Sequence, residues 1–138
     1  MKQPRVLVLD PGESTGMVFL YNGKVHGDTF EMWSKVDYYI RKLRPTVIVI
    51  ENFRLRRHAA LSLVGSDFPA IQVLGVIKFL AQYYGVPFVL QSPAVMSAMD
   101  RAVRPRGANE HIFDALKHGL VYLEGQGLLE SYQHLLED

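Results

Sequence analysis

The chain has 138 residues, of which 49% are hydrophobic and 21% are charged, and its formal net charge is +1. A typical domain has about 150 residues, so we predict a single domain over residues 1–138. The balance of apolar and charged residues excludes disordered, collagen-like and coiled-coil chains. The absence of cysteine excludes disulfide scaffolds and thiolate metal sites, so any metal must be held by oxygen or imidazole ligands.

The apolar runs are far shorter than the roughly 20 residues that cross a bilayer, and the first residues do not form a signal-peptide pattern. We therefore expect a cytoplasmic protein with no membrane segment. The charge is unevenly distributed, because residues 119–138 contain four acidic side chains and no Lys or Arg. Between Arg41 and Arg57, six basic residues stand against a single acid, a cluster that suits a polyanionic partner.

The N-terminal part of the chain has the pattern of three strands. Residues 5–10 form a continuous apolar run that ends in an acid, which is typical of a strand buried on both faces. Two β-rich runs follow at 16–21 and 24–30, separated by Asn22-Gly23, the strongest short hairpin signal. We predict that these three strands form an antiparallel meander.

The remaining elements alternate between helix and strand. Residues 52–69 show no clean period and contain several arginines, so we predict a long exposed loop there. The other predicted elements are a helix over 32–43, a buried strand over 46–50, a helix over 70–84, a strand over 86–90, a Ser92-capped helix to about 102, an Asn109-capped helix to about 123 and a short closing helix. This order predicts an α/β fold with a mixed five-stranded sheet, in which strands 1–3 are antiparallel and strands 1, 4 and 5 parallel, covered by helices on both faces.

Three acidic residues occupy positions that such a sheet brings to one edge. Asp10 and Glu51 end the two buried strands, and Asp114 lies on the helix that follows Asn109. His111 precedes Asp114 by three residues, so both project from the same helical face. Ligands collect at this edge of open α/β sheets. Each acid alone would also suit a solvated strand end or a first helical turn, and only the four together favour a functional site.

Carboxylates that gather without cations repel one another, so the cluster favours a divalent metal. The hard oxygen ligands suit Mg²⁺, with Mn²⁺ as a substitute. Two such ions about 4 Å apart can activate a water molecule and stabilise the leaving oxygen of a phosphodiester. We therefore predict a two-metal nuclease whose catalytic and metal-binding residues are Asp10, Glu51, His111 and Asp114.

Further residues surround this predicted centre. His118 follows Asp114 by four residues, where it would hydrogen-bond Asp114, supply a proton or serve the helix structurally. Ser14 and Thr15 belong to a Gly-rich turn over 10–16, of the kind that cradles a nucleotide phosphate in actin-like ATPases. That rival hypothesis needs ATP between two domains, which one domain does not provide, so we expect no nucleotide cofactor.

Four blocks of this sequence resemble RuvC-type Holliday junction resolvases, of a phage-encoded branch. The blocks are Val-Leu-Val-Leu-Asp-Pro-Gly-Glu-Ser-Thr-Gly at 6–16, Val-Ile-Val-Ile-Glu-Asn-Phe at 47–53, Val-Leu-Gln-Ser-Pro-Ala-Val at 89–95 and His-Ile-Phe-Asp-Ala-Leu at 111–116. The resemblance implies an RNase H-like fold, a homodimer, dependence on Mg²⁺ and paired symmetric nicking of a four-way DNA junction. In many relatives an Asp occupies the place of His111. The resemblance therefore does not decide whether His111 binds metal or transfers a proton.

The resemblance also indicates residues that contact DNA. Phe53 is similar to a family aromatic that stacks on bases near the crossover, although it stands one position earlier than expected. The arginines suited to phosphate contacts are Arg54, Arg56, Arg57, Arg101, Arg104 and Arg106. Lysines that the family places after its Ser-Pro motif are absent here. Nucleases of forks and flaps, and a junction-binding protein without catalysis, remain open alternatives.

The resemblance to a dimeric family raises the question of the dimer surface. Residues 70–84 place four apolar side chains along one helical stripe: Val73, Val76, Ile77 and Leu80. We predict this stripe as the dimer surface, although packing against the protein's own core is the commoner explanation of such a stripe.

Overall fold

The computed structural model describes residues 3–52 and 69–137. The predictions made for Phe53, Arg54, Arg56 and Arg57, and for most of the loop over 52–69, therefore lie outside the described residues. The elements in chain order are β1 (Val6–Asp10), β2 (Thr15–Tyr21), β3 (Lys24–Phe30), α1 (Ser34–Leu43), β4 (Val47–Glu51), α3 (Pro69–Tyr83), β5 (Phe88–Gln91), the 3-10 helix η1 (Pro93–Met99), α4 (Glu110–Gly125) and the 3-10 helix η2 (Leu129–Leu135).

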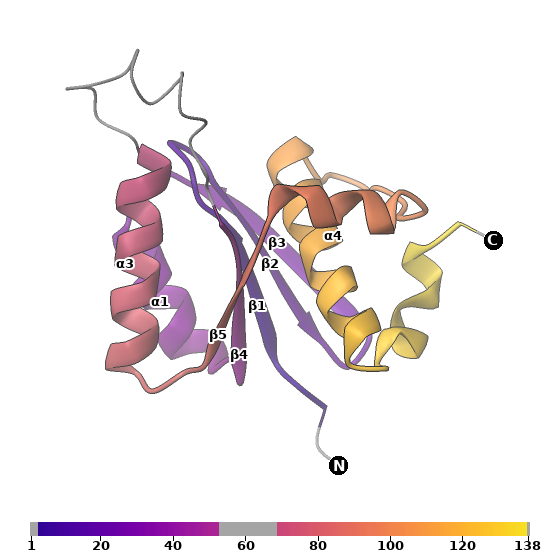
Figure 1. Cartoon of the computed structure of the whole chain (residues 1–138), viewed down its shortest axis with the longest axis horizontal. Helices are drawn as coiled ribbons and strands as arrows, with labels where there is room; N and C mark the ends of the chain where they lie inside the picture. The colour runs from indigo at the N-terminus through magenta and orange to yellow at the C-terminus, as the bar shows by residue number, and fades with distance from the viewer. Residues whose placement is uncertain (1–2, 53–68, 138) are drawn as a thin grey trace.

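The five strands form one mixed sheet in the order β3-β2-β1-β4-β5. β1 pairs antiparallel with β2, and β2 antiparallel with β3. β1 pairs parallel with β4, and β4 parallel with β5. The predicted fold class and strand directions are confirmed, and β1 lies at the centre of the sheet (Figure 1).

The turn between β2 and β3 has the conformation that its sequence predicts. Asn22 and Gly23 have φ values of 51° and 81°. Positive φ at both central residues is characteristic of a type I′ turn, whose twist matches that of the two strands. The Asn-Gly pair therefore fixes the register in which β2 and β3 pair, from Tyr21 opposite Lys24 to Thr15 opposite Phe30.

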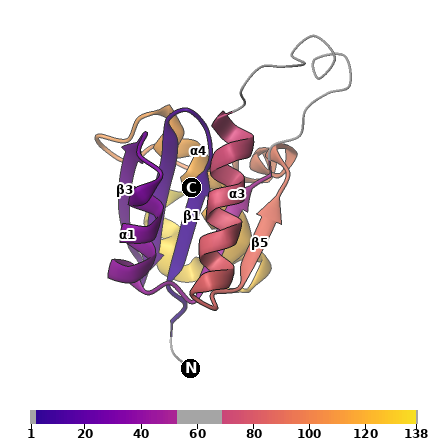
Figure 2. The ribbon, with the colours of Figure 1, turned by 90° about the vertical axis from the view of Figure 1, so that its left-hand side faces the viewer.

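Each face of the sheet is covered by its own layer of helices. Leu7 and Leu9 of β1 point toward α1 and α3, whereas Val6 and Val8 point toward α4. Figure 1 shows the two layers on either side of the sheet, and Figure 2 shows α1 and α3 side by side in front of it. All four of these β1 side chains are fully buried. Burying a Leu or Val side chain stabilises the folded state by about 1.5–3 kcal/mol. Because β1 buries side chains on both of its faces, it contributes strongly to the stability of the fold.

The helix α4 lies directly against β1 and β2 because glycines leave room for its backbone. A Cβ atom at Gly16 of β2 would lie 2.4 Å from the carbonyl oxygen of His111, at the start of α4. A Cβ at Gly119 of α4 would lie 2.6 Å from the Leu20 side chain and 2.9 Å from Val8. The first turn of α4, which contains His111, therefore rests on the strand that follows the Asp10 turn.

Replacement of Gly16 by alanine is expected to lower the unfolding free energy by about 1–3 kcal/mol, because overpacking forces the α4 backbone away from β2. Thermal denaturation followed by circular dichroism measures this change. Gly125→Ala in the last turn of α4 is the matched control, since an added Cβ there meets nothing within 4 Å. In a helix, Ala is favoured over Gly by up to about 1 kcal/mol, so the control should be at least as stable as the wild type. Equal stability of Gly16→Ala and the wild type would contradict the close approach.

Some boundaries differ from the sequence predictions. Ser92 accepts a hydrogen bond from the backbone N–H of Ala94, as expected of a cap, but the helix after it is a 3-10 helix that ends at Met99. Only Met99 of this segment is fully buried, so no apolar stripe supports a longer α-helix. Within the ranges 3–52 and 69–137, no helix is both long and apolar enough to span a membrane.

The predicted dimer stripe on α3 is partly wrong. Val73 and Ile77 are buried in the core between α3 and the sheet, so they cannot form a surface. Val76 and Leu80 instead line a groove between α3 and α1. The helix also exposes Phe79, and because apolar residues occur nearly all round it, the sequence pattern alone does not identify the face that meets the sheet.

Candidate active site

Two carboxylates meet at the edge of the sheet where β1 and β4 end. The strands are parallel neighbours, with Leu9 opposite Ile50, so Asp10 and Glu51 follow at adjacent positions. Asp10 is hydrogen-bonded to Glu51 through the side chains. Parallel pairing of two strands that each end in an acid thus produces the carboxylate pair.

The pKa shifts of Asp10 and Glu51 have opposite directions, which favours a single proton between the two carboxyl groups. Burial, the hydrogen bond to Glu51 and the negative charges of Glu51 and Asp114 together raise the pKa of Asp10 to about 9. Burial alone would raise the pKa of Glu51 as well, but hydrogen bonds to His118 and to Asp10 outweigh it and lower that pKa. At neutral pH, Asp10 therefore holds the proton and donates it in a hydrogen bond to the ionised Glu51.

His118 of α4 holds Glu51 from the other side. Its ring is fully buried, with Nε2 3.2 Å from Glu51 Oε1 and Nδ1 2.7 Å from Gln91 Oε1. An ionised carboxylate only accepts hydrogen bonds, so Nε2 donates to Glu51. Of the roles that the sequence leaves open for His118, a hydrogen bond to Asp114 is not the one observed, because its carboxylate partner is Glu51. The reason is that this part of α4 faces the sheet, above the ends of β4 and β5.

Gln91 is a site residue that the sequence reasoning missed. It is the last residue of β5 and lies opposite Glu51 in the parallel register between β4 and β5. The signal was present in the sequence, because Gln91 directly follows the predicted strand over 86–90. Polar residues at the carboxyl ends of three parallel strands all reach the same edge.

The turn after β1 and the first turns of α4 enclose a cavity of about 420 Å³. Asp10, His111 and Asp114 line this cavity together with residues 11–14 of the turn. Asn109 positions the helix, because its side-chain oxygen accepts a hydrogen bond from the N–H of Ile112 at 2.9 Å. Burial and the charges of Glu110 and Glu51 raise the pKa of Asp114, against the opposing charges of Lys117 and His118. The cavity is acidic because Asp10, Glu13 and Asp114 all line it.

Ser14 and Thr15 have different positions relative to this cavity. Ser14 lines it, whereas Thr15 is buried and its hydroxyl donates to the carbonyl of Gly12 at a long 3.5 Å, within the turn itself. The turn by itself does not distinguish the nuclease from the actin-like hypothesis, because a divalent cation would neutralise the same carboxylates in either case.

The donor chemistry of the site fits Mg²⁺ or Mn²⁺, because carboxylate oxygens and one imidazole come together from β1, β4 and α4. The mutual repulsion that raises the pKa of Asp10 is also what a divalent cation would relieve. Within the described part of the chain, however, no three His, Asp or Glu side chains are arranged to hold one metal ion together. Asp10 must lose its proton before it can act as a ligand.

The predicted DNA-binding arginines that the structure describes have distinct surroundings. Arg101 forms an ion pair with Glu124 at 2.5 Å, which ties it to the far end of α4. Arg104 lies over the ring of Phe113. Arg106 is exposed beside a second cavity that Gly27 and Ile112 also line.

Comparison with known proteins identifies the architecture. Neither a family model nor a curated protein matches the chain. Among solved structures, Thermus thermophilus RuvC in complex with a Holliday junction substrate matches with a TM-score of 0.68 and 18% identity, over 89% of this chain and 96% of that one. The chain has the fold of RuvC.

Two further structures agree with this result. A second Thermus thermophilus RuvC structure has a TM-score of 0.61 and 17% identity, over 89% of this chain and 96% of that one. The yeast mitochondrial Holliday junction resolvase Ydc2 has a TM-score of 0.62 and 15% identity, over 96% of this chain and 83% of that one. The RuvC-like fold expected from the four sequence blocks is confirmed, and these three matches give no support to a phage-encoded branch.

Proposed function

We propose that this protein is a metal-dependent endonuclease that resolves four-way DNA junctions by paired symmetric nicks. The observation that supports the proposal most directly is the hydrogen-bonded pair of Asp10 and Glu51 beside an acidic cavity, in a chain with the fold of RuvC. The neighbouring structures are RuvC with a Holliday junction and a Holliday junction resolvase. Junction DNA is therefore the substrate that we propose.

We propose the following roles for the four predicted catalytic residues. Asp10, Glu51 and Asp114 would hold the divalent ions. Bound there, the ions supply an activated water and stabilise the leaving oxygen of the phosphodiester. His111 lines the cavity with Asp114 and is exposed, and we propose that it binds metal or takes part in proton transfer.

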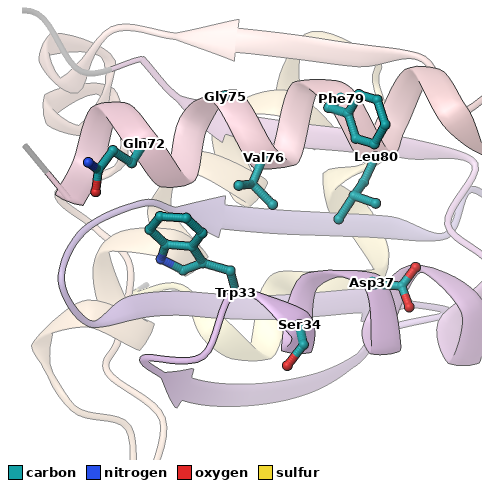
Figure 3. Close-up of a pocket in the computed structure, with 8 residues that line it drawn as sticks. All are labelled: Trp33, Ser34, Asp37, Gln72, Gly75, Val76, Phe79 and Leu80. Atoms are coloured by element: carbon teal, nitrogen blue, oxygen red, sulfur yellow. The ribbon is translucent and has the colours of Figure 1, made fainter.

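We propose that the protein acts as a homodimer, because two strands of a junction must be cut and a C₂ dimer presents two equivalent sites. The structure offers an apolar surface for this contact. A groove of about 770 Å³ separates α1 from α3, and Trp33, Val76 and Phe79 line it (Figure 3). Phe79 is 64% exposed and stacks on Tyr83, which is 71% exposed.

Replacement of Phe79 by aspartate is expected to shift the protein from dimer to monomer, because the new carboxylate would be buried in an apolar interface. Sedimentation velocity at micromolar concentration measures this shift. Gln82→Asp introduces the same charge on an exposed position of α3 that does not line the groove, and it should remain a dimer. A wild-type protein that sediments as a monomer would refute the dimer proposal.

The function is tested by comparing cleavage of a four-way junction, a Y-fork and a linear duplex of equal length in Mg²⁺, with the nick positions mapped. We expect paired symmetric nicks at the junction and none in the linear duplex. Preferential cleavage of the fork would assign the enzyme to other branched DNA. Tight binding to the junction with no nicking in either Mg²⁺ or Mn²⁺ would leave a junction-binding protein without catalysis.

A further inference from the structure

A hydrogen bond between two side chains attaches the start of α4 to the end of β3. Asn109 Nδ2 donates to Thr29 Oγ1 at 2.8 Å, although the two residues are 80 positions apart in the chain. The Oδ1 atom of the same amide accepts the N–H of Ile112 at 2.9 Å. An amide has its donor and its acceptor on separate atoms, so this one side chain both caps the helix and holds the strand.

Thr29 is itself held in place by the sheet and by α1. It is half-buried and lies opposite Gly16 in the register of β2 and β3. Its backbone N–H donates to Asp28 Oδ1 at 2.8 Å, and the Tyr39 hydroxyl of α1 donates to the other oxygen of that carboxylate. Because its backbone is fixed in this way, Thr29 presents its hydroxyl to α4 from a defined position.

The first turn of α4 is held by both of these neighbouring strands. On β2, the missing side chain of Gly16 leaves room for the carbonyl of His111. On β3, Thr29 holds Asn109, two residues before His111. His111 and Asp114 then line the acidic cavity from the turns that follow the cap. A displacement of about 1 Å in such groups can cost about 100-fold in rate, so the position of this turn matters for the site.

We propose that Thr29 is a positioning residue of the candidate active site: through Asn109 it fixes the first turn of α4, and with it the two α4 residues that line the acidic cavity. The inference rests on the proposed function, since it concerns residues that we propose to act on metal and DNA. Thr29 acts on the site only through the position of α4. Its loss therefore changes how the metal-binding side chains are placed without removing any of them.

Isothermal titration with Mn²⁺ in the absence of DNA tests the inference. Thr29→Val removes the hydroxyl and should weaken Mn²⁺ binding by about 10-fold, the lower end of the effect of losing a group that orients a metal ligand. The Mg²⁺ concentration for half-maximal junction cleavage should rise to the same extent. The melting temperature should stay close to that of the wild type, because valine favours strands and the Asn109 amide that loses its partner is exposed to water. Thr29→Ser retains the hydroxyl and should bind Mn²⁺ as the wild type does.

Two further variants isolate the contact. Asn109→Ser keeps a good helix cap but lacks the second polar atom with which Asn109 reaches Thr29. It should weaken Mn²⁺ binding as much as Thr29→Val, and the double variant should be no weaker, because both changes remove the same contact. Thr46→Val is the matched control, since the Thr46 hydroxyl accepts the backbone N–H of Arg5 at 2.9 Å, at the opposite end of β1 from Asp10. This control should keep the Mn²⁺ affinity of the wild type.

The outcomes separate the two proposals. If the wild type cleaves the junction and Thr29→Val keeps its metal dependence, Thr29 is a structural contact alone, and the inference is refuted while the proposed function stands. Additive losses in the double variant, or an equal loss in Thr46→Val, would refute it as well. If the wild type neither binds Mn²⁺ nor cleaves any of the three DNAs, the proposed function fails and the inference with it. Circular dichroism of each variant verifies the fold.

Discussion

Replacement of Asp10 by asparagine is expected to lower junction cleavage by about 10²–10³-fold or more, because it removes a charge that the reaction needs at its centre. Binding of the junction in EDTA should stay close to that of the wild type. The variant retains a donor for the hydrogen bond to Glu51, since the asparagine N–H can replace the proton that Asp10 holds. Loss of activity without loss of folding is therefore the expected result.

The same replacement should stabilise the metal-free protein. The folded pKa of Asp10 is about 9 and its ordinary value is 3.8, so the folded state binds a proton that the unfolded state releases between these values. The stability that comes from protonated Asp10 is complete below pH 3.8 and is lost as the pH rises toward 9. Asparagine does not titrate, so the advantage of the variant should grow with pH over this range.

Thermal denaturation in EDTA between pH 4 and pH 9 measures the difference. A gain of about 1 kcal/mol in the free energy of unfolding, evaluated at the melting temperature, corresponds to a rise of roughly 3–5 °C in Tm for a domain of this size. Added Mg²⁺ should raise the Tm of the wild type and have little effect on the variant, because binding to the folded state alone stabilises it. Undiminished cleavage by Asp10→Asn would remove Asp10 from the proposed mechanism.

Sequence reasoning predicted the parts of the fold that depend on local pattern. The apolar runs that end at Asp10 and Glu51 are each buried on both faces, and such runs occur in the interior of a parallel pair. The Asn22-Gly23 turn specified the hairpin through its positive φ angles. The side chain of Asn109, which caps the first turn, specified the start of α4. These features need only a few neighbouring residues.

Features that depend on how one element is rotated against another were not predictable. The spacing between His118 and Asp114 is the same whichever way α4 faces, and the close contacts at Gly16 and Gly119 decide that orientation. They turn His118 toward Glu51 and leave Asp114 at the cavity. The catalytic roles assigned to these residues remain predictions, to be decided by cleavage assays.

Replacement of His118 by leucine is expected to raise the Mg²⁺ concentration for half-maximal cleavage by about 10–100-fold, the usual effect of losing a group that orients a metal ligand. Leucine fills the buried space but leaves Glu51 Oε1 and Gln91 Oε1 without the partners that they have at 3.2 Å and 2.7 Å. An unpaired buried polar group costs about 1–3 kcal/mol, so a lower Tm should accompany the effect.

Two comparisons distinguish orientation of Glu51 from a general loss of stability. Gln91→Leu removes the support on the far side of the ring and should change the Mg²⁺ dependence in the same direction, because His118 then keeps only Glu51 to fix its position. His134→Leu, on the exposed face of η2, should leave both the Mg²⁺ dependence and the junction affinity unchanged. Isothermal titration with Mn²⁺ in the absence of DNA measures metal affinity directly. If His118→Leu binds Mn²⁺ as tightly as the wild type, His118 serves only the packing of α4, and the hydrogen-bonded chain from Gln91 through His118 to Glu51 has no part in metal binding.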